Sequence, residues 1–251
     1  MHQGGGVSDG RAEGFGELLS TLTLDRLGGQ PFGTVLADPP WRFMNRTGKV
    51  APEHKRLSRY DTLTWQEIGA LPIASVMAEQ SHCYLWVPNA LIADGLRVLG
   101  AWGFTYKTML IWHKVRKDGK SDGRGVGFYF RNVTEPVLFG VRGKLRTFAP
   151  GRRQVNFMAT QKREHSRKPD ELYPVIEACS PGPFLELFAR YPRSGWAVWG
   201  DEAAEQVVPR GRQYPAYGAS PVNGRRASVS DGEVSLEPRG SGRVGLAAQL
   251  P

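Results

Sequence analysis

The sequence of 251 residues predicts a single-domain α/β fold built on a doubly wound sheet. Short apolar runs of β type alternate with amphipathic helical stretches, as they do when helices join parallel strands. The length suits one domain of roughly 150 to 200 residues with tails. Polar ends, rich in Gly at residues 1–16 and in Pro, Gly, Ser and Arg at 209–251, are expected to be disordered and to flank a domain over 17–208.

Six apolar runs predict strands, and their composition indicates burial on both faces. They are GTVLA (33–37), HCYLWV (82–87), FTYKTMLIW (104–112), EPVLFGV (135–141), FLELFA (184–189) and WAVWG (196–200). Ligands of doubly wound sheets bind beyond the carboxyl ends of the strands. Asp38, which directly follows the first run, is therefore expected at a binding site.

Three stretches predict helices, over residues 63–73, 90–103 and 168–180. The third is expected to begin at Pro169, since proline suits a first turn and acids follow it, although Pro174 interrupts that turn. The segment 114–127, KVRKDGKSDGRGVG, has four glycines and no apolar period. It predicts a mobile basic loop.

The positive charge of the chain, +9 overall, is concentrated in one segment. Residues 105–168 carry 16 Lys and Arg against four acids, a local net charge of +12. This clustering favours nucleic acid as the partner, with a solvated basic face as the alternative. The predicted track for the phosphate backbone comprises Arg116, Lys117, Lys120 and Arg124 in the loop, and Arg142, Lys144, Arg146, Arg152 and Arg153 after the next strand.

The remaining composition excludes other classes of protein. Two cysteines, Cys83 and Cys179, are too few for a disulfide framework or a zinc site, and they favour a reducing compartment. No apolar run approaches the ~18 residues of a membrane span, and the N-terminus does not read as a signal peptide. We therefore expect a cytoplasmic protein with no metal and no membrane contact.

The segment VLADPPWRF (35–43) indicates a chemistry. Each proline holds the residue before it extended, so Asp38 and Pro39 are both fixed. Because Pro40 has no N–H, the Asp38 carboxylate and the Pro39 carbonyl are predicted to stay available to a ligand with two N–H donors. Trp41 offers a face that could stack on a base. The alternative is a strand and turn with Trp41 as core.

The amino group of a nucleobase meets these requirements. Two hydrogen bonds of about 2.9 Å would favour a tetrahedral nitrogen whose lone pair can attack an electrophile. The Asp38 carboxylate, charged at neutral pH, would stabilise the positive charge that grows on that nitrogen.

ADPPW (37–41), together with REHSRKPDELYPVIEACSPGPFLELFAR (163–190) and WGDE (199–202), resembles the MT-A70 family of adenine-N6 methyltransferases, over about residues 24–206. The resemblance implies a Rossmann-like fold with permuted motif order that uses S-adenosyl-L-methionine to methylate the N6 amine of adenine. Some members act on messenger RNA, and many bacterial and phage relatives act on DNA. The compact chain looks like a microbial or phage-type member.

The resemblance also implies roles for individual residues. Asp38, Pro39, Pro40 and Trp41 match the catalytic motif. Lys168 matches a lysine that pairs with the methionine carboxylate of the cofactor, and Arg190 an arginine on its ribose. Asp201 replaces the family's usual asparagine beside Glu202, which leaves the contact with the cofactor's adenine open. Glu186 is interpreted as structural, because an acid in an apolar strand needs a partner.

Four further residues match the side of the family's site that receives the target: Tyr60, Trp86, Asn132 and Glu135. Packing is the alternative for each. We expect DNA as the substrate, either single-stranded or with the base flipped out. RNA adenosine, a catalytically silent nucleic-acid-binding subunit and a protein amide remain alternatives, and the sequence leaves the oligomeric state open.

Overall fold

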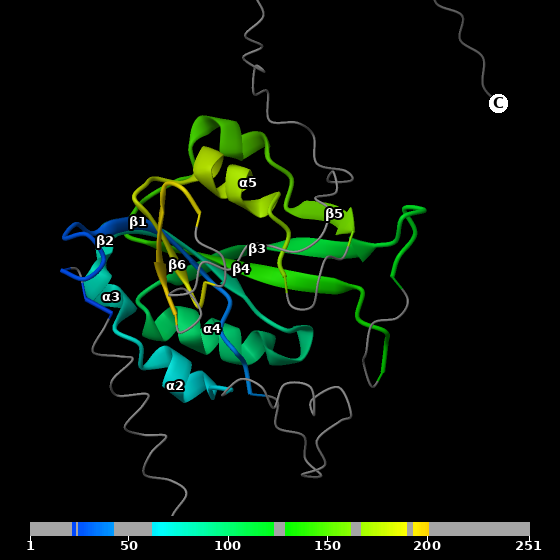
Figure 1. The fold of residues 1–251 in the computed structure, drawn as a ribbon, viewed down its shortest axis with the longest axis horizontal. Coiled ribbons are helices and arrows are strands. Elements are labelled where there is room, and N and C mark those ends of the chain that lie inside the picture. Colours follow the sequence, from blue (N-terminus) through cyan, green and yellow to red (C-terminus); the bar gives the residue numbers. More distant parts are fainter. Residues whose placement is uncertain are drawn as a thin grey trace, which may run out of the picture.

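Seven strands of the computed structural model form one sheet with helices on both faces (Figure 1). The structure describes residues 22–23, 25–42, 62–122, 129–161, 167–189 and 193–200. The predicted tails, 1–16 and 209–251, lie outside these residues. The predicted α/β fold class is confirmed.

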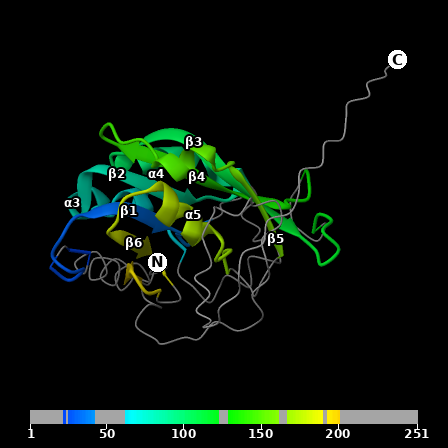
Figure 2. The same ribbon diagram turned by 90° about the horizontal axis from the view of Figure 1, so that it is seen from above.

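The strands are β1 (Phe32–Ala37), β2 (Met77–Trp86), β3 (Thr105–Val115), β4 (Thr134–Arg142), β5 (Phe157–Gln161), β6 (Phe184–Leu187) and β7 (Trp196–Trp199). Their order across the sheet is β5-β3-β4-β2-β1-β6-β7. Every neighbouring pair is parallel except those that involve β4, which runs antiparallel to both β2 and β3. Seen from above, the strands fan out between β6 and β5 (Figure 2). All six predicted strands are confirmed, and β5 was not predicted.

Helices α2 (Trp65–Gly69), α3 (Ile73–Val76) and α4 (Ile92–Ala101) cover one face of the sheet, and α5 (Leu172–Cys179) covers the other (Figure 1). The described residues also include two 3₁₀ helices, η2 (Asn89–Leu91) and η3 (Ala149–Arg153). The predicted helix 63–73 is two short helices. A capping box between Thr64 and Glu67 starts α2, and Pro72 separates α3 from it.

The sequence predicts a helix that begins at Pro169, but helix α5 begins at Leu172. The backbone N–H groups of Leu172 and Tyr173 donate to the carbonyls of Pro169 and Asp170 at 3.2 Å each, which makes a turn before the helix. A helix that began at Pro169 would place Pro174 where a backbone N–H is needed. Beginning at Leu172 puts Pro174 in the first turn, where its missing N–H costs no hydrogen bond.

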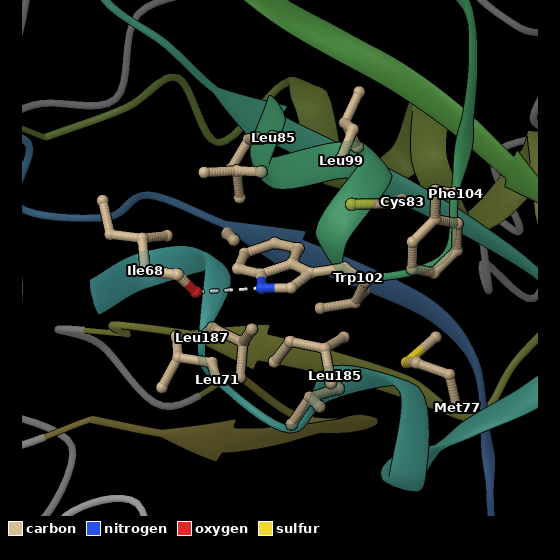
Figure 3. Close-up of a cluster of buried hydrophobic side chains, with 14 of the residues drawn as sticks. Ile68, Leu71, Met77, Cys83, Leu85, Leu99, Trp102, Phe104, Leu185 and Leu187 are labelled. Atoms are coloured by element: carbon tan, nitrogen blue, oxygen red, sulfur yellow. Dashed lines mark hydrogen bonds between the residues drawn. The ribbon is translucent and has the colours of Figure 1, made fainter. Parts of the chain in front are cut away.

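Each face of the sheet has its own hydrophobic core. On the α4 side, Trp102 is fully buried and its Nε1 donates to the carbonyl of Ile68 at 2.9 Å (Figure 3). On the α5 side, Ile176 packs in a separate cluster with strand residues. Strand β1 serves both cores, Val35 on one face and Leu36 on the other, so all six of its residues are buried as predicted.

Cys83 and Cys179 are both buried free thiols. Within the described ranges, no group of three or more His, Cys, Asp and Glu could hold a metal ion, and no helix is long and apolar enough to cross a membrane.

Candidate active site

The candidate site lies at the edge of the sheet where the parallel strands end. Asp38 directly follows β1, and Lys114 is next to last in β3. Because β4 runs the opposite way, it begins at this edge, and its second residue, Glu135, pairs with Trp112 of β3. Lys168 comes from the segment ahead of α5. Side chains from distant parts of the chain therefore meet at one place, as expected for a doubly wound sheet.

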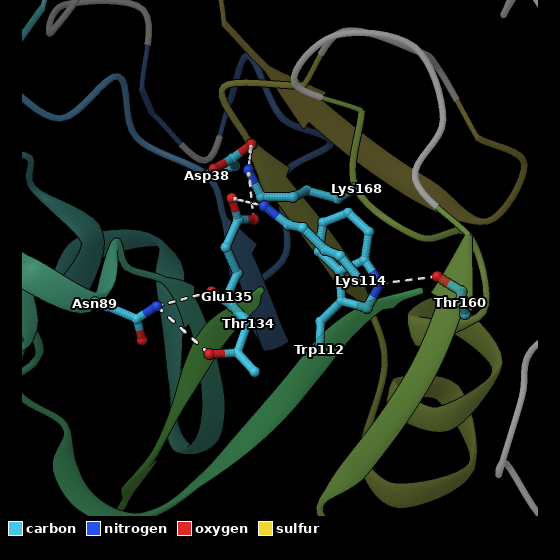
Figure 4. Close-up of polar contacts among 8 residues, drawn as sticks. All are labelled: Asp38, Asn89, Trp112, Lys114, Thr134, Glu135, Thr160 and Lys168. Atoms are coloured by element: carbon cyan, nitrogen blue, oxygen red, sulfur yellow. Dashed lines mark hydrogen bonds and ion pairs between the residues drawn. The ribbon is translucent and has the colours of Figure 1, made fainter. Parts of the chain in front are cut away.

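Four charged side chains of alternating sign form a row at this edge, which we call the charge row: Lys114, Glu135, Lys168 and Asp38 (Figure 4). The Nζ of Lys168 donates to Oδ2 of Asp38 at 2.8 Å and lies 3.7 Å from Oε2 of Glu135. The Nζ of Lys114 donates to Oε1 of Glu135 at 2.6 Å. The four side chains are 15–34% exposed, so water screens these pairs less than it screens surface pairs.

Two tryptophans form the floor of the charge row. The Nζ of Lys168 lies 5.3 Å from the ring centroid of Trp86, and that of Lys114 lies 4.9 Å from the ring of Trp112. The two rings meet edge to face with centroids 5.9 Å apart. Trp112 is anchored by its Nε1, which donates to Oγ1 of Thr160 at 2.8 Å. Both rings are buried, and the Lys168 cation lies over the face of Trp86. A contact of Trp86 with the target stays a prediction.

The Asp-Pro-Pro-Trp segment is closed more tightly than predicted. The N–H of Trp41 donates to the Pro39 carbonyl at 2.8 Å, and that of Leu63 donates to the Pro40 carbonyl at the same distance. The prediction that Pro39 lacks a protein donor is therefore wrong, because the turn brings the Trp41 N–H back to it. A carbonyl oxygen has a second lone pair, so Pro39 can still accept from a ligand.

Trp41 is a core residue in this structure. It is 5% exposed, and its Nε1 donates to the Trp86 carbonyl at 2.9 Å. The predicted stacking face is thus covered by the protein, and the core alternative describes Trp41. Its bond to the end of β2 ties the segment after β1 to the neighbouring strand.

The other predicted site residues divide into two groups. Asn132 is exposed just before β4, and Arg116, Lys117 and Lys120 are exposed on a turn after β3. In that turn Arg116 pairs with Asp118. Residues 114–122 are thus strand and turn, where a loop was predicted. Tyr60, Arg124, Arg190, Asp201 and Glu202 lie outside the described residues.

The structure divides the predicted basic track between two edges of the sheet. Arg116, Lys117 and Lys120 lie on the turn after β3, at the edge with Asp38. Antiparallel β4 carries Arg142 to the opposite edge, where its Nη1 donates to the Ala74 carbonyl at 2.8 Å. The four remaining residues of the predicted track follow β4 in the chain, once it has reached that edge: Lys144, Arg146, Arg152 and Arg153. One continuous track is therefore wrong, because it assumed that consecutive basic residues share an edge.

Glu186 of β6, for which the sequence predicted a structural role, is a further candidate for the site. Tyr173 Oη donates to its Oε1 at 2.8 Å. Burial raises the pKa of Glu186 to about 7; the nearby Asp38 charge acts in the same direction, and Tyr173 and Arg193 oppose it. Among the described residues, none donates a hydrogen bond to its buried Oε2. The acid in an apolar strand was the signal that could have identified it.

A mostly parallel sheet covered on both faces, with a row of charged side chains where the parallel strands end, is consistent with the architecture of a Rossmann-like methyltransferase. The family model of MT-A70 matches residues 32–202, more than half of the chain. The protein belongs to the MT-A70 family.

Three relatives show the range of similarity. The human METTL3 catalytic subunit of N(6)-adenosine-methyltransferase is 32% identical over 161 residues, which cover 63% of this chain and 26% of that protein. An Arabidopsis thaliana MT-A70-like N(6)-adenosine-methyltransferase is 28% identical over 233 residues, covering 88% and 31%. The type II methyltransferase M.MunI of Mycoplasma sp is 26% identical over 199 residues, covering 70% and 80%. The chain thus spans about a quarter to a third of the length of the plant and animal relatives.

Proposed function

We propose that the protein transfers a methyl group from S-adenosyl-L-methionine to the N6 amine of adenine in DNA. The observation that carries the proposal is the 2.8 Å pair between Lys168 and Asp38 at the carboxyl end of β1. It places the Lys168 ammonium group, which can bind the carboxylate of the cofactor, directly beside the Asp38 carboxylate, which can bind the target amine. Family membership supports the reaction class.

The chemistry of the donor set fits the cofactor. An ammonium group has three N–H donors, so Lys168 can hold a ligand carboxylate together with Asp38. The buried Oε2 of Glu186 would accept from a hydroxyl or ammonium group of a ligand, for which the described residues supply no substitute. When bound, S-adenosyl-L-methionine supplies a methyl group activated by a positively charged sulfur. By the family resemblance, Arg190, Asp201 and Glu202 are proposed to contact its ribose and adenine.

Asp38 is proposed to orient the attacking amine. Its carboxylate accepts one N–H of the amine, the Pro39 carbonyl accepts the other through its second lone pair, and both bonds favour a tetrahedral nitrogen. The Asp38 charge then stabilises the positive charge on nitrogen before a proton is lost. The ion pair with Lys168 fixes the position of the Asp38 carboxylate. Trp41 acts by anchoring this segment to β2.

The DNA preference is supported by the Mycoplasma relative. Its similarity to this chain extends over 80% of its own length, and microbial members of the family are the type expected to act on DNA. RNA is the second candidate substrate, because the human and plant relatives are named for adenosine, the ribonucleoside. The complete charge row argues against a catalytically silent subunit.

The test is methyl transfer with labelled S-adenosyl-L-methionine and matched DNA and RNA, each single-stranded and double-stranded. We expect transfer to DNA, and a loss of about 10²- to 10³-fold in kcat for Asp38→Ala. Asp94→Ala, on the surface of α4, is the matched control and should keep full activity. Cofactor binding without transfer to any nucleic acid would refute the proposed function.

A further inference from the structure

Two adjacent aromatic side chains stand almost entirely in solvent. Tyr129 is 95% exposed and Phe130 is 86% exposed, whereas the next most exposed large hydrophobic residue among those described, Val155, is 52% exposed. Aromatic rings are usually at least partly buried, because leaving their large apolar surface in water is unfavourable. A neighbouring pair with this exposure indicates a contact surface.

The pair lies at the same edge of the sheet as the charge row. The N–H of Lys114 donates to the Val133 carbonyl at 2.7 Å, which fixes the segment that follows Phe130 against the end of β3. Strand β4 begins at Thr134, four residues after Phe130, and contributes Glu135 to the charge row. Figure 1 shows this segment leading into β4 from the end of the sheet opposite the start of β3.

Positive charge accompanies the aromatic pair. Arg131 is exposed and directly follows Phe130, and Lys117 and Lys120 are exposed on the turn after β3. That turn is held at this edge because the Asp122 N–H donates to the Lys114 carbonyl at 2.9 Å. An apolar protein partner would find these cations unfavourable to cover, whereas a polyanion that also offers flat apolar faces matches both features.

We propose that Tyr129 and Phe130 form a stacking platform for unpaired bases of the nucleic acid strand that carries the target adenine. The inference rests on the proposed function and narrows its substrate to a single strand or an opened duplex. In a closed duplex, neighbouring base pairs cover the faces of each base, so exposed rings have nothing to stack on. In an unpaired strand each base offers a face, while Arg131, Lys117 and Lys120 contact its phosphates.

The experiment measures binding of fluorescent DNA to the full chain in the presence of S-adenosyl-homocysteine. The ligands are a single strand, its closed duplex, and the same duplex with one unpaired adenine. We expect the wild type to bind the single strand and the opened duplex more tightly than the closed duplex. Tyr129→Ala/Phe130→Ala is expected to weaken binding to the single strand by about 10- to 100-fold and binding to the closed duplex by less than twofold.

Two comparisons separate stacking from loss of structure. Tyr129→Phe/Phe130→Tyr keeps both rings and should bind as the wild type does. Tyr106→Ala removes a 38% exposed ring from the start of β3, at the opposite edge, and should also leave binding unchanged. Near-ultraviolet circular dichroism and cofactor affinity check that each variant is folded.

Three results would overturn the inference: equal single-strand affinity for wild type and the double alanine variant, equal weakening on single strand and closed duplex, or wild-type chains that associate through the two rings and bind no DNA. The failure of the proposed function looks different, since it is an absence of methyl transfer by a wild type that still binds DNA.

Discussion

Nζ of Lys168 donates to Oδ2 of Asp38 at 2.8 Å, across 130 residues of sequence. The pair joins the proposed position of the cofactor to the proposed position of the adenine. Any change at Lys168 is therefore expected to affect both cofactor affinity and the rate of transfer.

Lys168→Met is predicted to weaken cofactor binding by about 10- to 100-fold, because it removes a charge-assisted hydrogen bond, and to lower kcat as well. Lys168→Arg should retain part of the affinity. Calorimetry and single-turnover kinetics measure the two effects separately. Lys107→Met, an exposed residue of β3, is the control. Unchanged cofactor affinity in Lys168→Met would show that the cation serves Asp38 alone.

Glu135 is predicted to position Lys168 from the side opposite Asp38. Glu135→Gln should reduce kcat by about tenfold with a smaller change in KM for DNA, because it removes the negative charge that holds Lys114 and Lys168 in place against their mutual repulsion. If Lys114 acts through Glu135, the double variant Lys114→Met/Glu135→Gln should lose little more than Glu135→Gln. Additive losses would show that the two residues act independently. Arg97→Met, from an exposed pair on α4, is the control.

Glu186 makes a prediction about pH. Its pKa is raised to about 7, so it is mostly protonated at pH 6 and ionised at pH 8. A ligand group that donates to its Oε2 prefers the ionised form, so cofactor affinity should rise by up to about tenfold between these pH values. Glu186→Gln should remove this dependence. A pH profile that is the same in both proteins would return Glu186 to a structural role.

His82 predicts how stability depends on pH. The ring is fully buried, its Nδ1 lies 2.8 Å from Oγ of Ser180, and burial lowers its pKa to about 4. Between pH 6.5 and 4 the unfolded chain binds more protons than the folded one, so the free energy of unfolding falls as the pH falls, by on the order of 3 kcal/mol in total. Urea unfolding at several pH values should show that the free energy of unfolding of His82→Gln depends less steeply on pH than that of the wild type. His113→Gln, on a less buried part of β3, controls for loss of a histidine.

Six of the strands were predictable from local sequence because each contains a short run that is mostly apolar. Strand β5 was not, because it ends in polar Thr160 and Gln161, which are buried only through partners elsewhere in the chain. Thr160 is satisfied by Trp112, a residue of another strand. No local period reveals such a strand.

The candidate site was predictable in its residues but not in its contacts. Asp38 and Lys168 follow from the motifs, whereas their direct pairing depends on how distant elements meet. The burial of Trp41 was not predictable either, because the local sequence of a tryptophan after two prolines is the same whether its side chain faces solvent or the core. The reversal of β4, which sends Arg142 away from the site, has no signature in the charge pattern.

Strand β1 lies between β2 and β6, and β6 is among the last elements of the domain to be made. Until residues 184–187 have left the ribosome, one side of β1 is an unpaired, mostly apolar edge, which is a template for association with other chains. The nascent protein is therefore expected to carry the strand that precedes Asp38 unpaired on one side until late in its synthesis. Strand β6, which contains Glu186, is therefore also expected to protect β1 from aggregation once it pairs with it.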